Sequence, residues 1–266
     1  MSRMLRNVFL GAVGLFLCAP LVVVVGVSLN AEKRLFFPPE GLSLRWYGDM
    51  VTQSAWRDPI ENSLVIALCA GLISVSIALP LAYAMWRHRL FYARVLYGLG
   101  IAPFMLPPVI TALGFMIFWA SLGHYGRLEN DIIAHGIFLV TLPLMTISLG
   151  LESTDRAMVE AARTMGANER KVFTTVILPM IRPYIISGYA FAFVLSLNEY
   201  IIAYMVAGFT VETLPIKIFN SLRYGYTPVM AAVAVAFVAV ALLVFGIIGR
   251  YGNLPRLLGR WSPERQ

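Results

Sequence analysis

Residues 160–183 read EAARTMGANERKVFTTVILPMIRP, a charged and partly amphipathic stretch between two long apolar segments, 132–151 and 184–207. A helix needs about 20 apolar residues to cross the hydrocarbon core of a bilayer, and both flanking segments have that length. The stretch is therefore a polar connection between two predicted membrane spans.

Working outward, six apolar segments are long enough to cross a membrane: 8–29, 62–86, 95–120, 132–151, 184–207 and 229–250. The chain is 59% hydrophobic and 13% charged, which is typical of a membrane protein and not of a soluble domain. The connections between the segments are too short for a core of their own. We predict an all-α polytopic membrane protein with one transmembrane domain over residues 1–266.

The basic residues are unevenly distributed over alternate connections. Fourteen of the 21 Lys and Arg residues fall on one side: Arg3, Arg6, Arg87, Arg89, Arg94, Arg156, Arg163, Arg170, Lys171, Arg182, Arg250, Arg256, Arg260 and Arg265. The other side has Lys33, Arg34, Arg45, Arg57, Arg127, Lys217 and Arg223. Because positive charge favours the cytoplasmic side, we expect both termini and residues 152–183 to be cytoplasmic. The net charge of +7 reflects this topology, and no nucleic-acid partner is expected.

Several predicted spans contain proline, which removes a backbone donor and bends or interrupts a helix. Pro80 falls in the second span, Pro143 in the fourth, and Pro103, Pro107 and Pro108 in the third. The third span is therefore expected to be discontinuous. Its stretch FMLPPVIT either lines a cavity that satisfies the freed carbonyls or reflects the ordinary frequency of proline in membrane helices.

The stretch between the fourth and fifth spans predicts two short helices. Asp155 can cap the first, and Gly166 is its natural end because glycine readily adopts a left-handed conformation. The first helix has an apolar stripe at helical spacing, made of Met158, Ala161, Ala162 and Met165. A second apolar set, Val172, Phe173, Val176 and Ile177, is expected to end at Pro179.

A specific motif runs through both helices: Glu-Ala-Ala, three residues, Gly, nine residues, an aliphatic residue, one residue, then Leu-Pro. Its residues here are Glu160, Ala161, Ala162, Gly166, Val176, Leu178 and Pro179. The motif resembles the EAA loop of permease subunits of bacterial binding-protein-dependent ABC importers, with Val176 in the place where isoleucine is commoner. The alternative, an amphipathic helix lying on the membrane surface, does not account for this spacing.

The resemblance implies a type I importer permease fold in the bacterial inner membrane, with residues 152–183 as a coupling segment. Its coupling helix would dock into an ATPase subunit through the motif. The implied partners are a second permease subunit in a heterodimer, two ATP-binding cassette ATPases, an external solute-binding protein and membrane lipid. This chain would bind no cofactor, and the ATPases would use ATP and Mg.

A narrower resemblance concerns the solute. The stretches FVLSLNEYIIAYMVAG, 193–208, and TLPIKIFNSLRYGYTPVMAA, 213–232, are similar to the second permease chain of polyamine (putrescine and spermidine) importers. Permeases for ferric iron, aminoethylphosphonate and other small solutes have much of the same pattern and remain alternatives.

Glu199 is the one carboxylate expected inside a span. A charge there should face the bundle interior or water, which makes Glu199, with Asn198 and Tyr200, a candidate for the substrate path. Polyamine permeases carry acidic residues at the matching place, and Asn198 replaces one of them here. Glu199 could instead pair with a partner permease or lie in hydrated surroundings, and Tyr200 with Tyr204 could be interfacial anchors that do not stack on a cation.

The remaining polar residues and cysteines suggest no further site. Asp131 is expected in an external loop and His135 at the membrane interface, with no second histidine near it. Cys18 and Cys69 each lie inside an apolar run, so neither a disulfide nor a metal site is expected.

Enzyme classes are disfavoured because the chain contains no G-x-x-x-x-G-K phosphate loop, no H-E-x-x-H motif and no nucleophile elbow. We therefore expect no catalytic residues and an energy source on another polypeptide. The competing class is a secondary transporter or channel that uses Glu199 as an ion site, and such a protein would not need the coupling segment.

Overall fold

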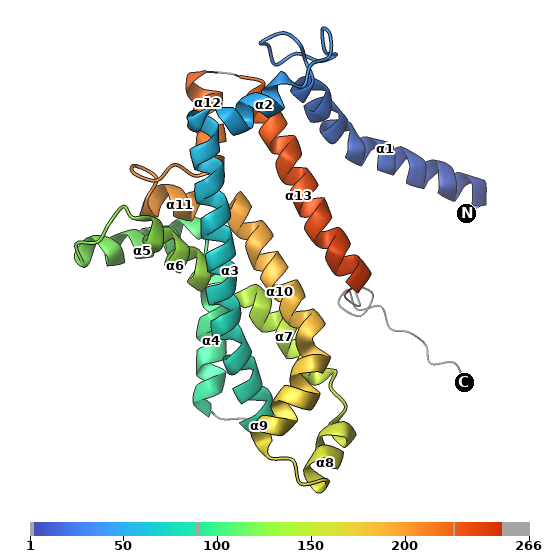
Figure 1. Cartoon of the computed structure of the whole chain (residues 1–266), viewed down its shortest axis with the longest axis vertical. Coiled ribbons are helices and arrows are strands. Elements are labelled where there is room, and N and C mark those ends of the chain that lie inside the picture. The colour runs from blue at the N-terminus through green and yellow to red at the C-terminus, as the bar shows by residue number, and fades with distance from the viewer. Residues whose placement is uncertain (1–2, 89–90, 226, 252–266) are drawn as a thin grey trace. The chain divides into compact units, whose positions relative to one another are not determined.

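The computed structural model describes residues 3–88, 91–225 and 227–251 (Figure 1). Within these ranges the chain is helical and forms no β-strand. The elements are α1 (Arg3–Ser28), α2 (Arg45–Thr52), α3 (Ser54–His88), α4 (Phe91–Met105), α5 (Pro108–Ser121), α6 (Leu128–Phe138), α7 (Thr141–Glu152), α8 (Arg156–Thr164), α9 (Glu169–Val172), the π-helical turn η1 (Phe173–Ile177), α10 (Leu178–Asn198), α11 (Ile201–Val206), α12 (Leu214–Tyr224) and α13 (Val229–Tyr251). Arg89, Arg256, Arg260 and Arg265, which entered the prediction of topology, lie outside the described residues.

The described residues form two compact units. The first takes the described residues within Met1–Ile60 and Ile216–Leu242, and the second takes those within Glu61–Pro215 and Leu243–Gln266. The single transmembrane domain expected over 1–266 therefore stays a prediction.

In the first unit, a buried asparagine organises the connection between α1 and α2. The Oδ1 atom of Asn30 accepts hydrogen bonds from the backbone N–H groups of Glu32 and Glu40, each 3.1 Å long. Its carbonyl accepts a 2.6 Å hydrogen bond from Nε1 of Trp46, which is buried at the start of α2. These bonds give the loop a defined path although it contains little regular structure.

The number of membrane-length helices agrees with the sequence. Four helical runs among the described residues are long and apolar enough to cross a membrane, and six are obtained when each of two bent helix pairs is taken as one span. The all-α polytopic fold is confirmed.

Proline interrupts some of the predicted spans and leaves another continuous. α4 and α5 meet at an angle of 110° around Leu106 and Pro107, so the predicted break in the third span is confirmed. α6 and α7 meet at 40°, just ahead of Pro143. At Pro80 the helix is not interrupted, because α3 is one continuous helix, and a bend there stays a prediction. A single missing hydrogen bond is tolerated there, since apolar helical sequence continues on both sides.

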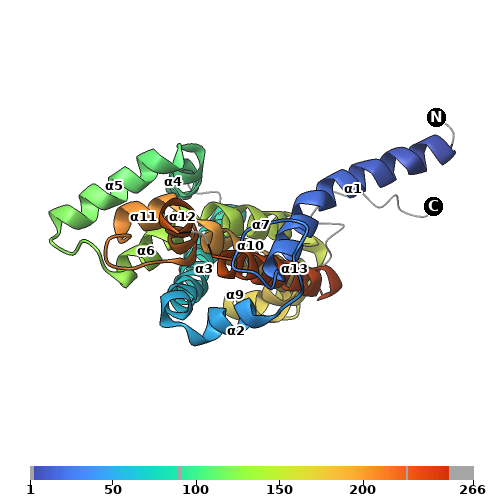
Figure 2. The same cartoon turned by 90° about the horizontal axis from the view of Figure 1, so that it is seen from above.

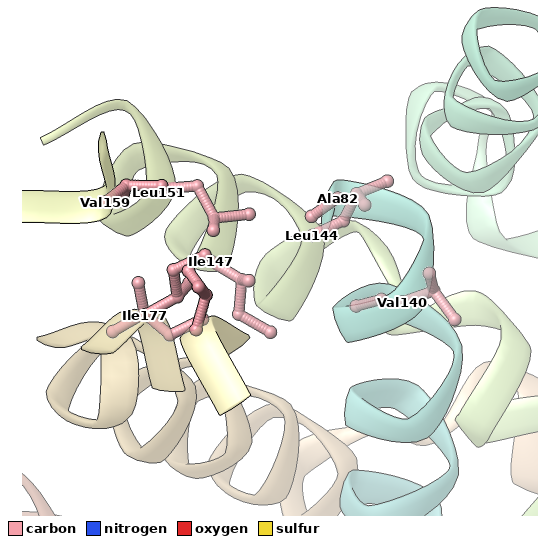
Figure 3. Packing of buried hydrophobic residues seen from close by; sticks show 10 residues of the cluster. Ala82, Val140, Leu144, Ile147, Leu151, Val159 and Ile177 are labelled. Carbon is pink, nitrogen blue, oxygen red and sulfur yellow. The ribbon is translucent and has the colours of Figure 1, made fainter. Parts of the chain in front are cut away.

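The core of the second unit lies where α7 packs along α10. A Cβ atom added at Gly188 of α10 would lie 2.7 Å from Cα of Pro143, and one added at Gly150 of α7 would lie 2.7 Å from the ring of Tyr184. Small residues at these positions let the two backbones approach closely. Buried residues of α3, α7, α8, η1 and α10 form the apolar cluster beside this contact, including Ala82, Leu144, Ile147, Val159 and Ile177 (Figure 3).

A second apolar cluster in the same unit joins α5, α6, α10 and α11. Its buried members are Ala112, Ala134, Phe138, Leu139, Ala192, Ile202 and Val206. Figure 2 shows α5, α6 and α11 grouped together. This packing brings the N-terminal half of the fourth predicted span against the end of the fifth.

The fifth span differs from its prediction at both ends. Helical structure runs for 30 residues, from Glu169 to Asn198, so Pro179 does not end the second short helix. The π-helical turn directly before α10 shifts the hydrogen-bond register at the place where Pro179 has no N–H to donate. At the other end, the expected continuous span to residue 207 breaks after Asn198, and α11 follows.

Candidate functional site

The coupling segment, residues 152–183, folds as the capping residues predict. Asp155 accepts a 2.8 Å hydrogen bond from the backbone N–H of Ala157 at the start of α8. At the other end Gly166 has a φ of +80°, and the N–H groups of Gly166 and Ala167 bond to the carbonyls of Arg163 and Ala162. This arrangement is a Schellman motif, in which a left-handed residue closes the helix.

Helix α8 has one buried face and one exposed face. Val159 is 3% exposed and packs in the cluster of Figure 3, while Ala162 is half-buried. The rest of the predicted apolar stripe points outward: Met158 is 51% and Met165 87% exposed, and Ala161 is exposed as well. α8 therefore presents small and flexible apolar side chains at the surface, a composition that suits contact with another protein.

Four charged side chains hold the coupling segment together. Arg163 Nη1 lies 2.7 Å from Glu160 Oε1, and Arg163 Nη2 donates to Glu169 Oε2 over 3.2 Å. Arg87, at the end of α3, donates to the other oxygen of Glu169 over 3.1 Å. The hydrogen bond from Arg87 lowers the pKa of Glu169. Glu169 is the first residue of the 30-residue helical run, which is longer than the about 20 residues that a span needs, and it lies before the predicted span 184–207. The network ties the α8–α9 turn to α3.

Two further motif residues, Leu178 and Pro179, lie after the turn. Leu178 is the first residue of α10 and is half-buried, whereas Pro179 is exposed. Glu160 is exposed too, and its partner is Arg163 of the same chain. The residues of the motif thus lie on both sides of the turn between α8 and α9. Figure 1 shows these two helices and the loop that joins them.

Glu199 lies at the break between α10 and α11. Its Oε2 atom accepts hydrogen bonds from the backbone N–H groups of Ile202 (2.8 Å) and Ala203 (3.3 Å), and its Oε1 atom accepts one from Ile201 (3.1 Å). The side chain is 10% exposed. Glu199 therefore caps the unsatisfied donors at the start of α11, a place where a negative charge is stabilised.

The two neighbours proposed with Glu199 have separate contacts. Asn198 is exposed and donates a 2.8 Å hydrogen bond to the carbonyl of Val194, one turn earlier. The ring of Tyr200 stacks on Tyr204 with centroids 5.5 Å apart.

Asp131 and His135 have surroundings of low solvent exposure. Both lie on α6 and are buried, Asp131 at 0% and His135 at 1% exposure, so the placement of Asp131 in an external loop is wrong. His135 Nδ1 lies 2.8 Å from Ser196 Oγ, and its Nε2 lies 3.6 Å from Glu199 Oε2. The packing of α6 against α10 and α11 causes this burial. Among the described residues, no group of three His, Cys, Asp or Glu is arranged to hold a metal ion.

One sequence signal could have found this pair. Asp131 and His135 are four residues apart and therefore on one face of a helix, at the start of an apolar segment. What the sequence lacks is any indication that this face turns toward Glu199, which is 64 positions further along the chain.

Comparisons with known proteins identify the family and relatives of this chain. A family model described as binding-protein-dependent transport system inner membrane component matches residues 70–253. A putrescine transport system permease protein, PotI of Escherichia coli (strain K12), is 34% identical over 258 residues, covering 94% of this chain and 89% of the relative. A spermidine/putrescine transport system permease protein, PotC of Haemophilus influenzae, is 29% identical over 91% of this chain and 94% of its own.

Solved structures show the same fold at lower identity. A chain of a bacterial ABC transporter involved in the import of the acidic polysaccharide alginate superimposes with a TM-score of 0.73 at 18% identity, covering 95% of this chain and 99% of that chain. A chain of the MetNI methionine ABC transporter superimposes with a TM-score of 0.62 at 18% identity, covering 77% and 95%. The importer permease fold expected from the sequence is confirmed.

Proposed function

Because the chain belongs to the family of binding-protein-dependent transport system inner membrane components, we propose that it is the permease subunit of an ATP-driven polyamine importer, with putrescine or spermidine as solute. The observation that carries the proposal is a carboxylate, Glu199, at a helix break inside a chain that is similar to putrescine and spermidine permeases over most of its length. A carboxylate lowers the energy of a cation in surroundings of low dielectric constant.

The energy for transport comes from other subunits. This chain has no phosphate-binding loop of its own. It works with a second, related permease subunit, two ATPase subunits that bind ATP and Mg, and an external solute-binding protein. It binds no cofactor and catalyses no reaction.

The coupling segment transmits the movement of the ATPases. The outward face of α8, with Met158, Ala161 and Met165, docks on an ATPase subunit, while Val159 fixes α8 to the permease core. Glu160 remains largely exposed and can contact the partner as well as Arg163. Closure of the ATPases on ATP moves α8, and the ion network passes this movement to α3 through Arg87.

Orientation follows from this role. The ATPases are cytoplasmic, so residues 152–183 and both termini lie on the cytoplasmic side of the inner membrane, in agreement with the bias of Lys and Arg.

The solute passes the α10–α11 break. Glu199 attracts the cation, and Asn198 and Tyr200 lie on the same path. Hydrogen bonds from three backbone N–H groups hold the Glu199 carboxylate in position. These donors are uncharged, so they do not neutralise the carboxylate.

The test is ATP hydrolysis by the complete complex in nanodiscs, with the binding protein titrated with putrescine, spermidine, ferric iron and aminoethylphosphonate in turn. Stimulation by a polyamine is the expected result. Stimulation by iron or the phosphonate alone would overturn the polyamine assignment and keep the importer, whereas solute uptake without any ATPase subunit would overturn the importer.

A further inference from the structure

Two buried polar side chains of the second unit have no part in the function proposed above. Within the part of the chain that the structure describes, neither carboxylate oxygen of Asp131 has a hydrogen-bond partner, and Nε2 of His135 has none. Both side chains are at most 1% exposed. Buried polar atoms are nearly always paired, so unpaired ones in a closed site indicate a missing partner.

The charges around these atoms say what kind of partner is missing. His135 lies 3.6 Å from Glu199, and Asp131 lies one helical turn before His135 on α6, so two carboxylates belong to this region. No Lys or Arg is paired with either carboxylate within the described residues. An uncompensated carboxylate in a membrane interior is expensive, and a second one beside it adds to the cost. The site therefore calls for a cation or a proton.

The arrangement of acceptors favours an ammonium group over a metal ion. His135 Nδ1 can donate to Ser196 Oγ, 2.8 Å away, and this tautomer leaves a lone pair on Nε2. The 3.6 Å between Nε2 and Glu199 Oε2 is too long for a hydrogen bond, but a third group can bind both atoms. An ammonium group has three N–H donors, enough for these two atoms and for the carboxylate one helical turn away at Asp131, whereas no group of three His, Cys, Asp or Glu among the described residues is arranged to hold a metal ion.

We infer that Asp131 and His135 of α6, together with Glu199, bind the protonated amino end of the polyamine during its passage. This inference rests on the polyamine importer function and extends it, because it makes α6 a substrate-binding element. Asp131 supplies the second negative charge that Asn198 cannot supply.

The site is closed in this structure, so the amino group enters when the helices around it move. Two interruptions between helices lie next to the site. Glu199 and Tyr200 separate α10 from α11, and Leu139 and Val140 separate α6 from α7. Such junctions can take up the dihedral changes of an opening movement. A closed site also excludes water, which strengthens the attraction between the ammonium group and the carboxylates.

The test measures putrescine uptake and ATP hydrolysis in the same proteoliposomes with the complete complex. Asp131→Asn removes the charge at nearly constant size, and His135→Gln removes the ring acceptor. Asp131→Glu restores the charge. The matched control is Glu129→Gln in the same first turn of α6, since Glu129 is exposed and pairs with Arg127 at 3.5 Å.

We expect Asp131→Asn to lower uptake per ATP by about tenfold or more, the usual loss for one charged hydrogen-bond partner. His135→Gln should lower the ratio less, Asp131→Glu should recover part of it, and Glu129→Gln should match the wild type. ATP hydrolysis stimulated by the loaded binding protein should remain in all four variants.

Wild-type uptake per ATP in both Asp131→Asn and His135→Gln would overturn the inference. So would a parallel loss of uptake and ATP hydrolysis that Asp131→Glu does not relieve, because it would show a structural role. If Asp131→Asn does not assemble, the ratio for His135→Gln decides by itself. Lack of any stimulation of the wild-type complex by polyamines is a separate result that would remove the proposed function and this inference with it.

Discussion

The coupling segment and the region of the α10–α11 break each contain a central glutamate, but the two carboxylates differ in solvent exposure and in the groups that bind them. Glu160 of the coupling segment is 67% exposed and has an arginine at 2.7 Å. Glu199 is 10% exposed and is held by backbone N–H groups, with a histidine 3.6 Å away. One region keeps its charges in contact with water, and the other takes them out of it.

This difference separates stability from function in each region. An exposed ion pair contributes about 0–1 kcal/mol, so the charges of the coupling segment are expected to matter for docking more than for folding. Burying a charge without a countercharge costs several kcal/mol. A charged side chain in such a place therefore indicates a functional role. Variants that separate these two roles test the comparison.

The largest effect is expected at the helix break. Glu199→Gln removes the negative charge and keeps an oxygen that can cap α11, so the helix should remain. Putrescine uptake by the complete complex should fall by about ten- to a hundredfold, because a charged hydrogen bond to the cation is lost. ATP hydrolysis stimulated by the loaded binding protein should change little. Uptake at the wild-type rate would remove Glu199 from the substrate path.

The next effect is expected at the turn of the coupling segment. Gly166→Val places a β-branched residue at a φ of +80°, which costs about 1–2 kcal/mol and distorts the end of α8. Uptake and stimulated ATP hydrolysis should fall together, because docking fails. Gly166→Asn is the control, since asparagine tolerates this conformation. Equal loss in both variants would show that backbone conformation at Gly166 is not the cause.

A smaller effect distinguishes the two faces of α8. Val159→Ala removes buried apolar volume and should destabilise the second unit by about 1–3 kcal/mol, seen as a lower melting temperature of the purified complex. Met158→Ala, on the exposed face, should leave the melting temperature unchanged and weaken the binding of the ATPase subunit. The reversed pattern would mean that α8 is turned the other way.

The smallest effect is expected for Glu160→Gln. It breaks one exposed ion pair, and Glu169 still binds Arg163, so thermal stability should change by less than about 1 kcal/mol. A melting-temperature measurement in low and high salt checks this, because screening should remove most of the remaining difference. A loss of several kcal/mol would show that the ion network stabilises the fold.

Local signals predicted the coupling segment well. Asp155 caps α8 and Gly166 ends it in the left-handed conformation, because both effects depend on a few neighbouring residues. The break at Leu106 and Pro107 was predictable for the same reason. The prediction failed at Pro179, where a π-helical turn lets the helix continue, and the sequence FTTVI gives no clear sign of such a turn.

The candidate substrate site was predictable in part. Glu199 stood out as a charge in an apolar segment, but the break beside it did not, since LNEYII contains neither glycine nor proline. The burial of Asp131 and His135 depends on the packing of α6 against α10 and α11. Contacts between residues so far apart in the chain are set by tertiary structure, and the local pattern around Asp131 suggested a loop.

The most direct test of separate roles for the two regions is a paired measurement of putrescine uptake and putrescine-stimulated ATP hydrolysis in the same proteoliposomes, for Glu199→Gln and Gly166→Val. Separate roles predict that uptake per ATP falls in Glu199→Gln, while Gly166→Val loses both activities and keeps the ratio of any residual transport. The same ratio change in both variants, or an unchanged ratio in Glu199→Gln, would contradict the account.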